Sequence, residues 1–305
     1  MSFDFKKLKV LVIGDLMIDN YIFGKSNRLS PEAPVPVIRP SRNYYTAGGA
    51  ANVAMNISSL GAQVTCAGVI GDDDWGKKLL SLLKNENIDV QNIDIIPNFY
   101  TTLKQRIFLN ETQIFRIDNE NFLEKKCSFM KRNFDNFDVI ILSDYNKGVL
   151  TGRWFNKPEG SIVCLDPKKS LVNFNHSDIL TPNLSELAYL SKNKINSEND
   201  IVQSCKIILN KYNLEYIIAK RGSEGMTIVG NNNYVKHLKA RFVKTADVTG
   251  AGDTVISSLS LAFAITKDIF QSAEFAINAS ALAVSKPGTS TITIQDINNY
   301  INTNE

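Results

Sequence analysis

The run Asp247-Val-Thr-Gly-Ala-Gly-Asp-Thr254 combines a glycine-rich turn with a carboxylate, and a long apolar segment follows it. Gly250 and Gly252 can adopt backbone angles closed to other residues, so consecutive N–H groups can converge on one point. The helix that starts there adds a partial positive charge. Asp253 falls in its first turn, where it can accept a proton. An anion cradle beside a base is what phosphoryl transfer to a hydroxyl needs. The spacing alone leaves a second interpretation open, a mere tight connection.

A second glycine pair, in the run Gly48-Gly-Ala-Ala-Asn52, opens another predicted helix. Its small residues let a ligand approach the backbone, and Asn52 offers a donor and an acceptor to a sugar with vicinal hydroxyls. Asp15 and Asp19 follow the first predicted strand, and a carboxylate at a strand end can bind two adjacent hydroxyls. We select Asp15 as the sugar ligand; the alternative is that Asp15 only caps the turn.

Two further motifs have the chemistry of a nucleotide site. Asn183 and Glu186 lie three residues apart, on one face of a helix, where they can hold hydrated magnesium. The alternative is a helix cap with Glu186 as its capping-box partner. The stretch Lys220–Met226 leaves a strand through a glycine-rich turn, which can bring Lys220 and backbone groups to nucleotide phosphate or ribose. A simple β-hairpin turn is equally compatible with that stretch.

The elements that must position these residues follow an alternating pattern. Short, continuous apolar strands alternate with helices, which predicts a parallel sheet covered on both faces. Ligands then bind beyond the carboxyl ends of the strands, where the polar motifs at 14–15, 143–144, 166–168 and 220–222 fall. The predicted strands are 9–13, 64–69, 139–142, 162–165, 179–180, 216–219 and 226–229. The predicted helices are 47–60, 75–83, 201–209, 252–265 and 269–285.

Two segments break this alternation. Tyr21–Tyr45 is polar and contains four prolines, and Thr101–Asp118 alternates in polarity like exposed strands around a turn at 110–113. Strand segments so far apart in the sequence can pair into a small sheet over the site, a lid. An ordinary sheet edge is the alternative.

Composition excludes several classes of function. The 34 Lys and Arg residues against 31 Asp and Glu give a net charge of +3, too small to favour nucleic acid or an anionic membrane as a partner. None of the four cysteines lies in a CxxC pair, which fits a reducing compartment and gives no metal site. The longest apolar stretch, Thr254–Ile265, is too short to span a bilayer, and the N-terminus enters a strand almost at once. We expect a cytoplasmic protein.

With these motifs assembled, the chain from Val10 to Ile301 resembles the ribokinase-like (PfkB) carbohydrate kinases. Gly48-Gly49…Asn52 resembles the N-terminal signature of that family, and Asp247–Thr254 resembles its more specific C-terminal signature. The resemblance implies one domain over 1–305. It implies a three-layer α/β/α fold with a mainly parallel central sheet and a small β lid, formed by about 18–46 and 101–118.

A narrower resemblance is to the D-glycero-β-D-manno-heptose 7-phosphate kinases, which make the 1,7-bisphosphate on the route to ADP-heptose for lipopolysaccharide. It rests on the segments Arg28–Val37, Gly48–Gly61, Ser143–Gly148, Thr181–Glu186 and Gly288–Thr291. In many of these proteins a nucleotidylyltransferase domain follows the kinase. This chain stops at Glu305, so we expect a stand-alone kinase that uses ATP and Mg²⁺.

The resemblance also implies a role for individual residues. Asp253 would deprotonate the anomeric hydroxyl, and the N–H groups of Gly250, Ala251 and Gly252 would form the anion hole. The metal would be organised, through water, by Asn183 and Glu186. The nucleotide would be bordered by Lys220, Gly222, Gly225 and Thr249, with Asn278 near the adenine. The sugar would be held by Asp15, Gly48, Gly49 and Asn52.

Specificity for a 7-phosphate needs cations at the far end of the sugar. The candidates, which the sequence does not rank, are Lys104, Arg106, Arg116 and Lys147, and Glu32 is a candidate for hydroxyl contacts. Lids in this family often pair between subunits, so we expect a homodimer through the β lid. The nearest alternative is a kinase for fructose, ribose or a nucleoside. A non-catalytic sugar-phosphate sensor is disfavoured, since a sensor does not need Asp253.

Overall fold

The computed structural model describes residues 3–124, 127–152, 154–169, 177–244, 247–286 and 288–304. Within this part of the chain, a nine-stranded sheet has the order β13-β12-β11-β10-β9-β8-β1-β4-β5. Its strands from β5 to β11 pair in parallel, while β12 and β13 form an antiparallel edge. The strands are β1 (Lys9–Gly14), β4 (Gln63–Gly71), β5 (Asp89–Ile96), β8 (Val139–Ser143), β9 (Ile162–Asp166), β10 (Ile179–Leu180), β11 (Tyr216–Lys220), β12 (Met226–Gly230) and β13 (Val235–Leu238).

Two apolar cores lie on opposite faces of this sheet, because successive side chains of each buried strand point to opposite sides. Val10 and Val12 of β1 pack with one core, and Leu11 and Ile13 pack with the other. The first core includes α1 (Ala50–Ser59), α2 (Asp74–Asn85), α5 (Ala251–Thr266), α6 (Ile269–Val284) and α7 (Ile294–Asn304). The second includes α3 (Leu184–Ser191) and α4 (Glu198–Tyr212). The expected three-layer α/β/α arrangement is therefore confirmed.

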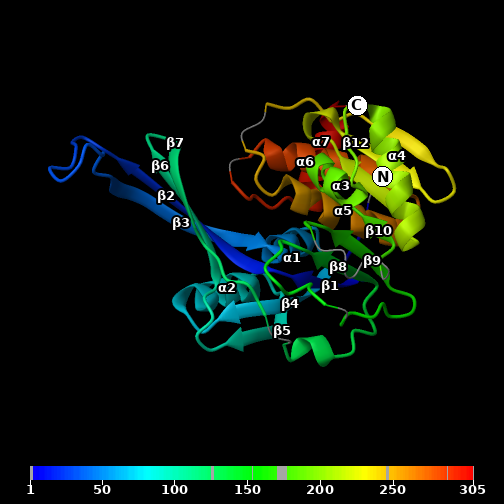
Figure 1. Ribbon diagram of the computed structural model, residues 1–305, viewed down its shortest axis with the longest axis horizontal. Coiled ribbons are helices and arrows are strands. Elements are labelled where there is room, and N and C mark those ends of the chain that lie inside the picture. The colour runs from blue at the N-terminus through cyan, green and yellow to red at the C-terminus, as the bar shows by residue number, and fades with distance from the viewer. Residues whose placement is uncertain are drawn as a thin grey trace.

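A second, four-stranded sheet extends from the layers as an arm (Figure 1). It has the order β3-β2-β6-β7, formed by β2 (Leu16–Lys25), β3 (Arg39–Gly49), β6 (Thr102–Leu109) and β7 (Thr112–Asn119). One face carries stacked aromatic rings, with Tyr21 on Tyr44 at 5.0 Å and Phe23 on Phe108 at 4.5 Å between centroids. The two segments that break the alternation in the sequence thus form one small sheet.

The structure departs from the predicted elements at a few points. The helix expected from residue 47 begins at Ala50, because Ala47–Gly49 pair with Leu16–Ile18 as the end of β3. Two polar edge strands, β5 and β13, and the last helix, α7, were not predicted. All four cysteines are buried, and none of them forms a disulfide. No helix in the described part of the chain combines the length and hydropathy that a membrane span requires.

Candidate active site

Asp253 lies in the first turn of α5, and its carboxylate is held from two sides. Asn52 Nδ2 donates to Oδ2 at 2.7 Å, and the Tyr145 hydroxyl donates to Oδ1 at 2.6 Å. The residue is only 5 % exposed, and burial raises the pKa of Asp253 to about 6. Burial and the neighbouring Asp253 raise the pKa of Tyr145 well above its usual value, so its hydroxyl remains a donor. The result is an oriented carboxylate with a raised proton affinity, which suits a general base.

The glycine turn before Asp253 has the geometry of an anion site. Gly250 is the N-cap of α5 in the left-handed conformation, with φ 79° and ψ 0°, and no side chain caps this helix. Within the described residues, the N–H groups of Gly250 and Gly252 meet no protein acceptor, whereas Ala251 N–H donates to Val248 O at 3.2 Å. Of the three predicted anion-hole donors, Gly250 and Gly252 are therefore the better available, and the partial positive charge of the helix end adds to them.

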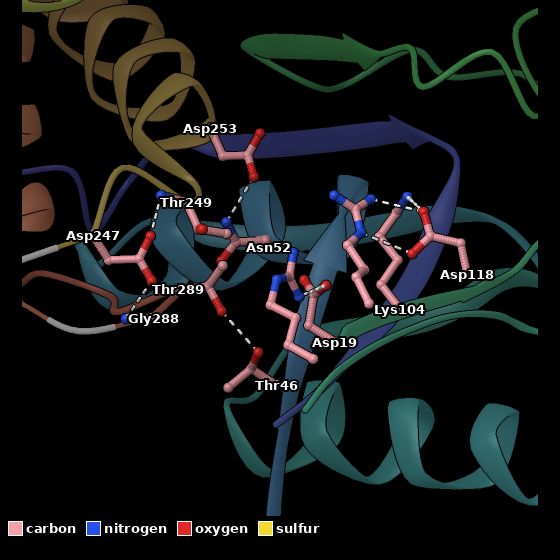
Figure 2. Close-up of polar contacts among 12 residues, drawn as sticks. Asp19, Thr46, Asn52, Lys104, Asp118, Asp247, Thr249, Asp253, Gly288 and Thr289 are labelled. Atoms are coloured by element: carbon pink, nitrogen blue, oxygen red, sulfur yellow. Dashed lines mark hydrogen bonds and ion pairs between the residues drawn. The ribbon is translucent and has the colours of Figure 1, made fainter. Parts of the chain in front are cut away.

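Asp247 and Thr249 shape this turn. Asp247 Oδ1 accepts from Thr249 N at 2.8 Å, and Oδ2 accepts from Gly288 N at 3.2 Å (Figure 2). Thr249 is predicted to border the nucleotide, and its backbone N–H is already used inside the turn. Thr289 follows Gly288, and its hydroxyl forms a hydrogen bond of 2.7 Å with the hydroxyl of Thr46 on β3. This bond connects the turn to the small sheet.

A cavity of about 670 Å³ opens beside Asp253 and the α5 N-terminus. The predicted nucleotide residues Asn183, Glu186, Lys220, Gly222 and Gly225 all line it, as do Gly250, Ala251 and Gly252. Asn278 does not line it: its Oδ1 accepts from Arg241 Nε at 3.0 Å, and Arg241 forms that part of the wall. Asn278 therefore does not itself reach the cavity, whereas Ile277 and Ala281 of the same helix do. Its expected place near the adenine stays a prediction.

Charged groups gather at the inner end of the cavity. Lys220 Nζ contacts Asp166 Oδ1 at 2.5 Å, and a Cβ added to Gly252 would lie 3.3 Å from the same ammonium. Lys220 is thus directed at the α5 N-terminus, where its charge can stabilise a phosphate. Lys168 Nζ contacts Glu186 Oε1 at 2.7 Å. The sequence analysis assigns no role to Asp166 or Lys168, although Asp166 ends β9 and Lys168 follows two residues later, among the polar residues at the strand ends.

Asn183 and Glu186 form the capping box that was the alternative to a metal site. Asn183 Oδ1 accepts from Glu186 N at 2.9 Å, and Glu186 Oε2 accepts from Asn183 N at 2.8 Å. No cluster of three or more His, Cys, Asp or Glu side chains within the described residues could hold a metal ion. Both Glu186 oxygens already have partners, so the donor set fits a hydrated magnesium ion contacted through water, and direct coordination is disfavoured.

Gly48 and Gly49 end β3 beside a buried carboxylate that the sequence left unassigned. A Cβ added to Gly48 would lie 2.5 Å from Asp19 Oδ2, so this approach requires glycine. Asp19 is buried and accepts from Arg106 Nη1 at 2.6 Å. Burial raises the pKa of Asp19 in spite of Arg106. Asp19 thus faces the glycine pair predicted to line the sugar, and it is the better candidate for binding hydroxyls.

Asp15 has a different role from the predicted one. Its carboxylate accepts from the backbone N–H groups of Tyr145 at 2.8 Å, Lys147 at 3.1 Å and Val149 at 3.1 Å. These bonds leave little capacity for a sugar hydroxyl and give Asp15 the task of ordering the loop that carries Tyr145. Asn52, also predicted to hold the sugar, uses its amide N–H on Asp253 and acts as a positioning residue.

The four candidate phosphate-binding cations lie on or beside the small sheet, each with a carboxylate partner. Arg106 pairs with Asp19, and Arg116 makes two bonds to Asp118 at 2.8 and 2.7 Å. Lys104 Nζ lies 3.4 Å from Asp118 (Figure 2). The same ammonium lies 2.9 Å from Glu120. Lys147, in the loop after β8, also contacts Glu120. Glu32 is exposed in the segment that joins β2 to β3 at the outer end of the arm, away from α5 (Figure 1). The structure does not bring it to the site.

Residues 7–296 match the pfkB family of carbohydrate kinases. The chain belongs to this family. Among curated relatives of this carbohydrate kinase, the bifunctional protein HldE of Helicobacter acinonychis is 37% identical over 95% of this chain and 65% of the relative. The bifunctional protein HldE of Haemophilus influenzae is 38% identical over 98% of this chain and 65% of the relative. The chain therefore spans about two thirds of the length of these relatives.

Solved structures support the same fold for this carbohydrate kinase. The ribokinase of Thermotoga maritima has a TM-score of 0.77 at 21% identity and covers 97% of this chain and 99% of its own. The Arabidopsis thaliana ribokinase complexed with ribose and ATP has a TM-score of 0.75 at 19% identity, over 96% and 98% of the two chains. Family membership makes this protein a sugar kinase that uses ATP, which agrees with the anion site and oriented carboxylate at α5.

Proposed function

We propose that this carbohydrate kinase transfers the γ-phosphoryl group of ATP to the anomeric 1-hydroxyl of D-glycero-β-D-manno-heptose 7-phosphate. The product is the 1,7-bisphosphate, a precursor of ADP-heptose in lipopolysaccharide core synthesis. The observation that carries this choice is the group of cations beside Asp19 and Gly48, in which Lys104 and Lys147 share one carboxylate, because a terminal phosphate supplies an anion that both lysines can bind. The motif resemblance to heptose 7-phosphate kinases and the identity with HldE proteins support the same choice.

The transfer follows from the residues around Asp253. The sugar lies against Gly48 and Gly49, with Asp19 accepting from its hydroxyls, and its 1-hydroxyl faces Asp253. Asp253 takes the proton of that hydroxyl as the oxygen attacks the γ-phosphorus. The bond from that phosphorus to the bridging oxygen breaks, and ADP leaves with the electron pair. The N–H groups of Gly250 and Gly252, with Lys220, stabilise the charge on the transferring group.

Magnesium fits this site through water held by Asn183 and Glu186. Bound there, it would neutralise charge on the nucleotide phosphates. The capping box fixes both side chains at the start of α3, where both residues line the cavity. The positive charge of Lys168 balances the negative charge of the buried Glu186 carboxylate with which it pairs.

We propose that the small sheet is a lid and that a second copy of the chain covers its outer face. The β-pairing puts Ile22, Ile107 and Phe115 on the face opposite the cations, and Phe115 is 58% exposed there. Ile117 adds to the same apolar surface. Exposed apolar residues gathered on one sheet face favour association. Sedimentation of wild type and of Phe115→Lys tests this: a dimer that the substitution dissociates is expected, and a wild-type monomer at micromolar concentration contradicts it.

The deciding experiment is an assay of ATP consumption over a panel of sugars with and without a terminal phosphate. We expect turnover to depend on D-glycero-D-manno-heptose 7-phosphate. Strong turnover of fructose, ribose or a nucleoside with none of the heptose phosphate would assign a different sugar kinase. No ATP consumption with any sugar, together with heptose phosphate binding, would favour a sensor.

A further inference from the structure

Glu120 occupies a position that links two lysines from separate parts of the chain. It follows β7 directly, in a stretch without regular secondary structure. Lys104 of β6 donates to Oε1 at 2.9 Å, and Lys147, from the loop after β8, donates to Oε2. The side chains of Lys104 and Lys147 are 14% and 23% exposed, and that of Glu120 is 31% exposed. Two largely covered lysine side chains therefore converge on one carboxylate that can reach solvent.

The two arginines of the same group are already satisfied in a different way. Arg106 is held by Asp19 and lies over the Tyr21 ring at 5.1 Å, while Arg116 is bonded through two nitrogens to Asp118. The Arg116–Asp118 pair is a two-point pair, which is fixed in geometry and costly to exchange. Arg106 makes one bond to Asp19, and both of these side chains are nearly covered. Lys104 and Lys147 instead share Glu120, and an ammonium group adapts readily to a new partner.

Charge matching favours a phosphate over Glu120 at this position. Lys104 also lies within 3.4 Å of Asp118, which Arg116 shares, so the cluster holds three cations against two carboxylates and a net charge of +3 − 2 = +1. A phosphate monoester carries about −1.5 to −2 at neutral pH and has three acceptor oxygens, so it balances both lysines. Burial opposes ionisation, but the hydrogen bonds from Lys147 and Lys104 hold the pKa of Glu120 below its usual value. Glu120 is therefore an anion at neutral pH.

The location fits the far end of the sugar. Lys104 pairs with Asp19 across the β2–β6 register, and Asp19 faces Gly48. Lys147 follows Tyr145 by two residues in the loop that Asp15 holds. Tyr145 and Asp253 thus lie at one end of the proposed sugar site, and Lys104 and Lys147 lie at the other end.

We propose that Glu120 is an internal stand-in for the terminal phosphate of the substrate: it holds Lys104 and Lys147 together in the empty site and swings into solvent when that phosphate binds. The inference rests on the proposed function. Glu120 then disfavours binding of sugars that have no terminal phosphate, because such a sugar cannot replace the Glu120 carboxylate between the two lysines. Discrimination between phosphorylated and unphosphorylated sugars follows from the exchange of one anion for another.

The first test is kinetic, on the full chain. Glu120→Gln removes the competing charge, so KM for heptose 7-phosphate should fall about fivefold, while KM for the unphosphorylated heptose should not fall. Lys147→Met should raise KM for the phosphorylated sugar about tenfold to hundredfold. Glu111→Gln is the matched control, because Glu111 is an exposed carboxylate in the turn of the same hairpin. A KM that is unchanged or raised by Glu120→Gln, with wild type active, overturns the proposal.

The second test needs no sugar turnover, so it separates this inference from the proposed function. Calorimetric titration with inorganic phosphate should show tighter binding to Glu120→Gln than to wild type, and the gain should vanish in the Glu120→Gln/Lys147→Met double variant. Equal phosphate affinity in wild type and Glu120→Gln, including none in both, overturns the proposal. A wild type that binds phosphate in this pattern but consumes no ATP with heptose 7-phosphate overturns the proposed substrate alone.

Discussion

The substitution Asp253→Asn separates the chemistry of the base from its structural role. An amide fits the space of the carboxylate: its oxygen can accept from Asn52 Nδ2, and its nitrogen can donate to the Tyr145 hydroxyl. The fold and the nucleotide cavity should therefore persist. The amide cannot take the proton, so turnover should fall about 10²–10⁴-fold, the usual contribution of a general base. At 1.36 kcal/mol per tenfold, this corresponds to roughly 2.7–5.4 kcal/mol of transition-state stabilisation.

The same substitution should raise stability at neutral pH. Burial raises the pKa of Asp253 from 3.8 to about 6, so the native state binds a proton more tightly than the unfolded state. The stability that this protonated carboxyl provides is full below about pH 4 and is lost as pH rises to about 6. Above pH 6 the buried charge costs about 3 kcal/mol, from about two pKa units at 1.36 kcal/mol each. The Asn variant does not carry that cost.

Two measurements check this reasoning. In a coupled ATP assay, wild-type kcat/KM should fall tenfold per pH unit below about pH 6, as the base becomes protonated. Thermal unfolding should show the variant to be the more stable protein at pH 7.5 and close to wild type at pH 4. Asp72→Asn, at an exposed carboxylate before α2, serves as the control. Near-normal turnover of Asp253→Asn would refute its role as base, and a variant less stable than wild type at pH 7.5 would refute the assigned cost of burial.

Three more substitutions probe the surroundings of the base. Tyr145→Phe removes a hydrogen bond that lowers the pKa of Asp253. Turnover should therefore drop about tenfold, and the acid limb of the pH–rate profile should move to higher pH. An acid limb at the wild-type pH would contradict this. Gly48→Ala puts a methyl group 2.5 Å from Asp19 Oδ2. KM for the sugar should therefore rise at least about tenfold, while KM for ATP should stay unchanged. Equal changes in the KM for the sugar and the KM for ATP would argue against a sugar-specific role. Lys220→Met leaves buried Asp166 without its cation and should cost about 3 kcal/mol in unfolding free energy. Adding Asp166→Asn should restore stability but not the affinity for ATP, and a double variant as unstable as the single one would contradict the pairing.

Much of the central sheet could be predicted because its strands are buried on both faces. Such strands read as continuous apolar runs, and Val10–Ile13 is fully buried as that pattern requires. Elements with one exposed face were harder to find. Strands β5 and β13 lie at the sheet edges, and α7 is mostly polar, so their composition resembles that of loops. In such short or polar elements too few apolar residues recur to reveal a regular period.

The site was predictable where backbone geometry demands a particular residue. Gly250 in the left-handed conformation and Gly48 against Asp19 both require glycine, and both stood out as motifs. The roles of Asp15 and Asp19 could not be told apart from the sequence. Which of them faces the ligand depends on β2 starting at Leu16 and on a loop 130 residues further along the chain. Tyr145 was missed for the same reason, since its contact with Asp253 joins segments 108 residues apart.

The reassignment of Asp15 links the two ends of the substrate site. The buried Asp15 carboxylate accepts hydrogen bonds from the N–H groups of every second residue in this loop, namely Tyr145, Lys147 and Val149. Tyr145 holds the base, and Lys147 holds Glu120. The separation between the catalytic carboxylate and the cation pair is therefore set by a rigid loop rather than by flexible side chains alone. Phosphoryl transfer depends mostly on positioning, so a loop that fixes both ends of the sugar contributes to rate and to substrate choice together.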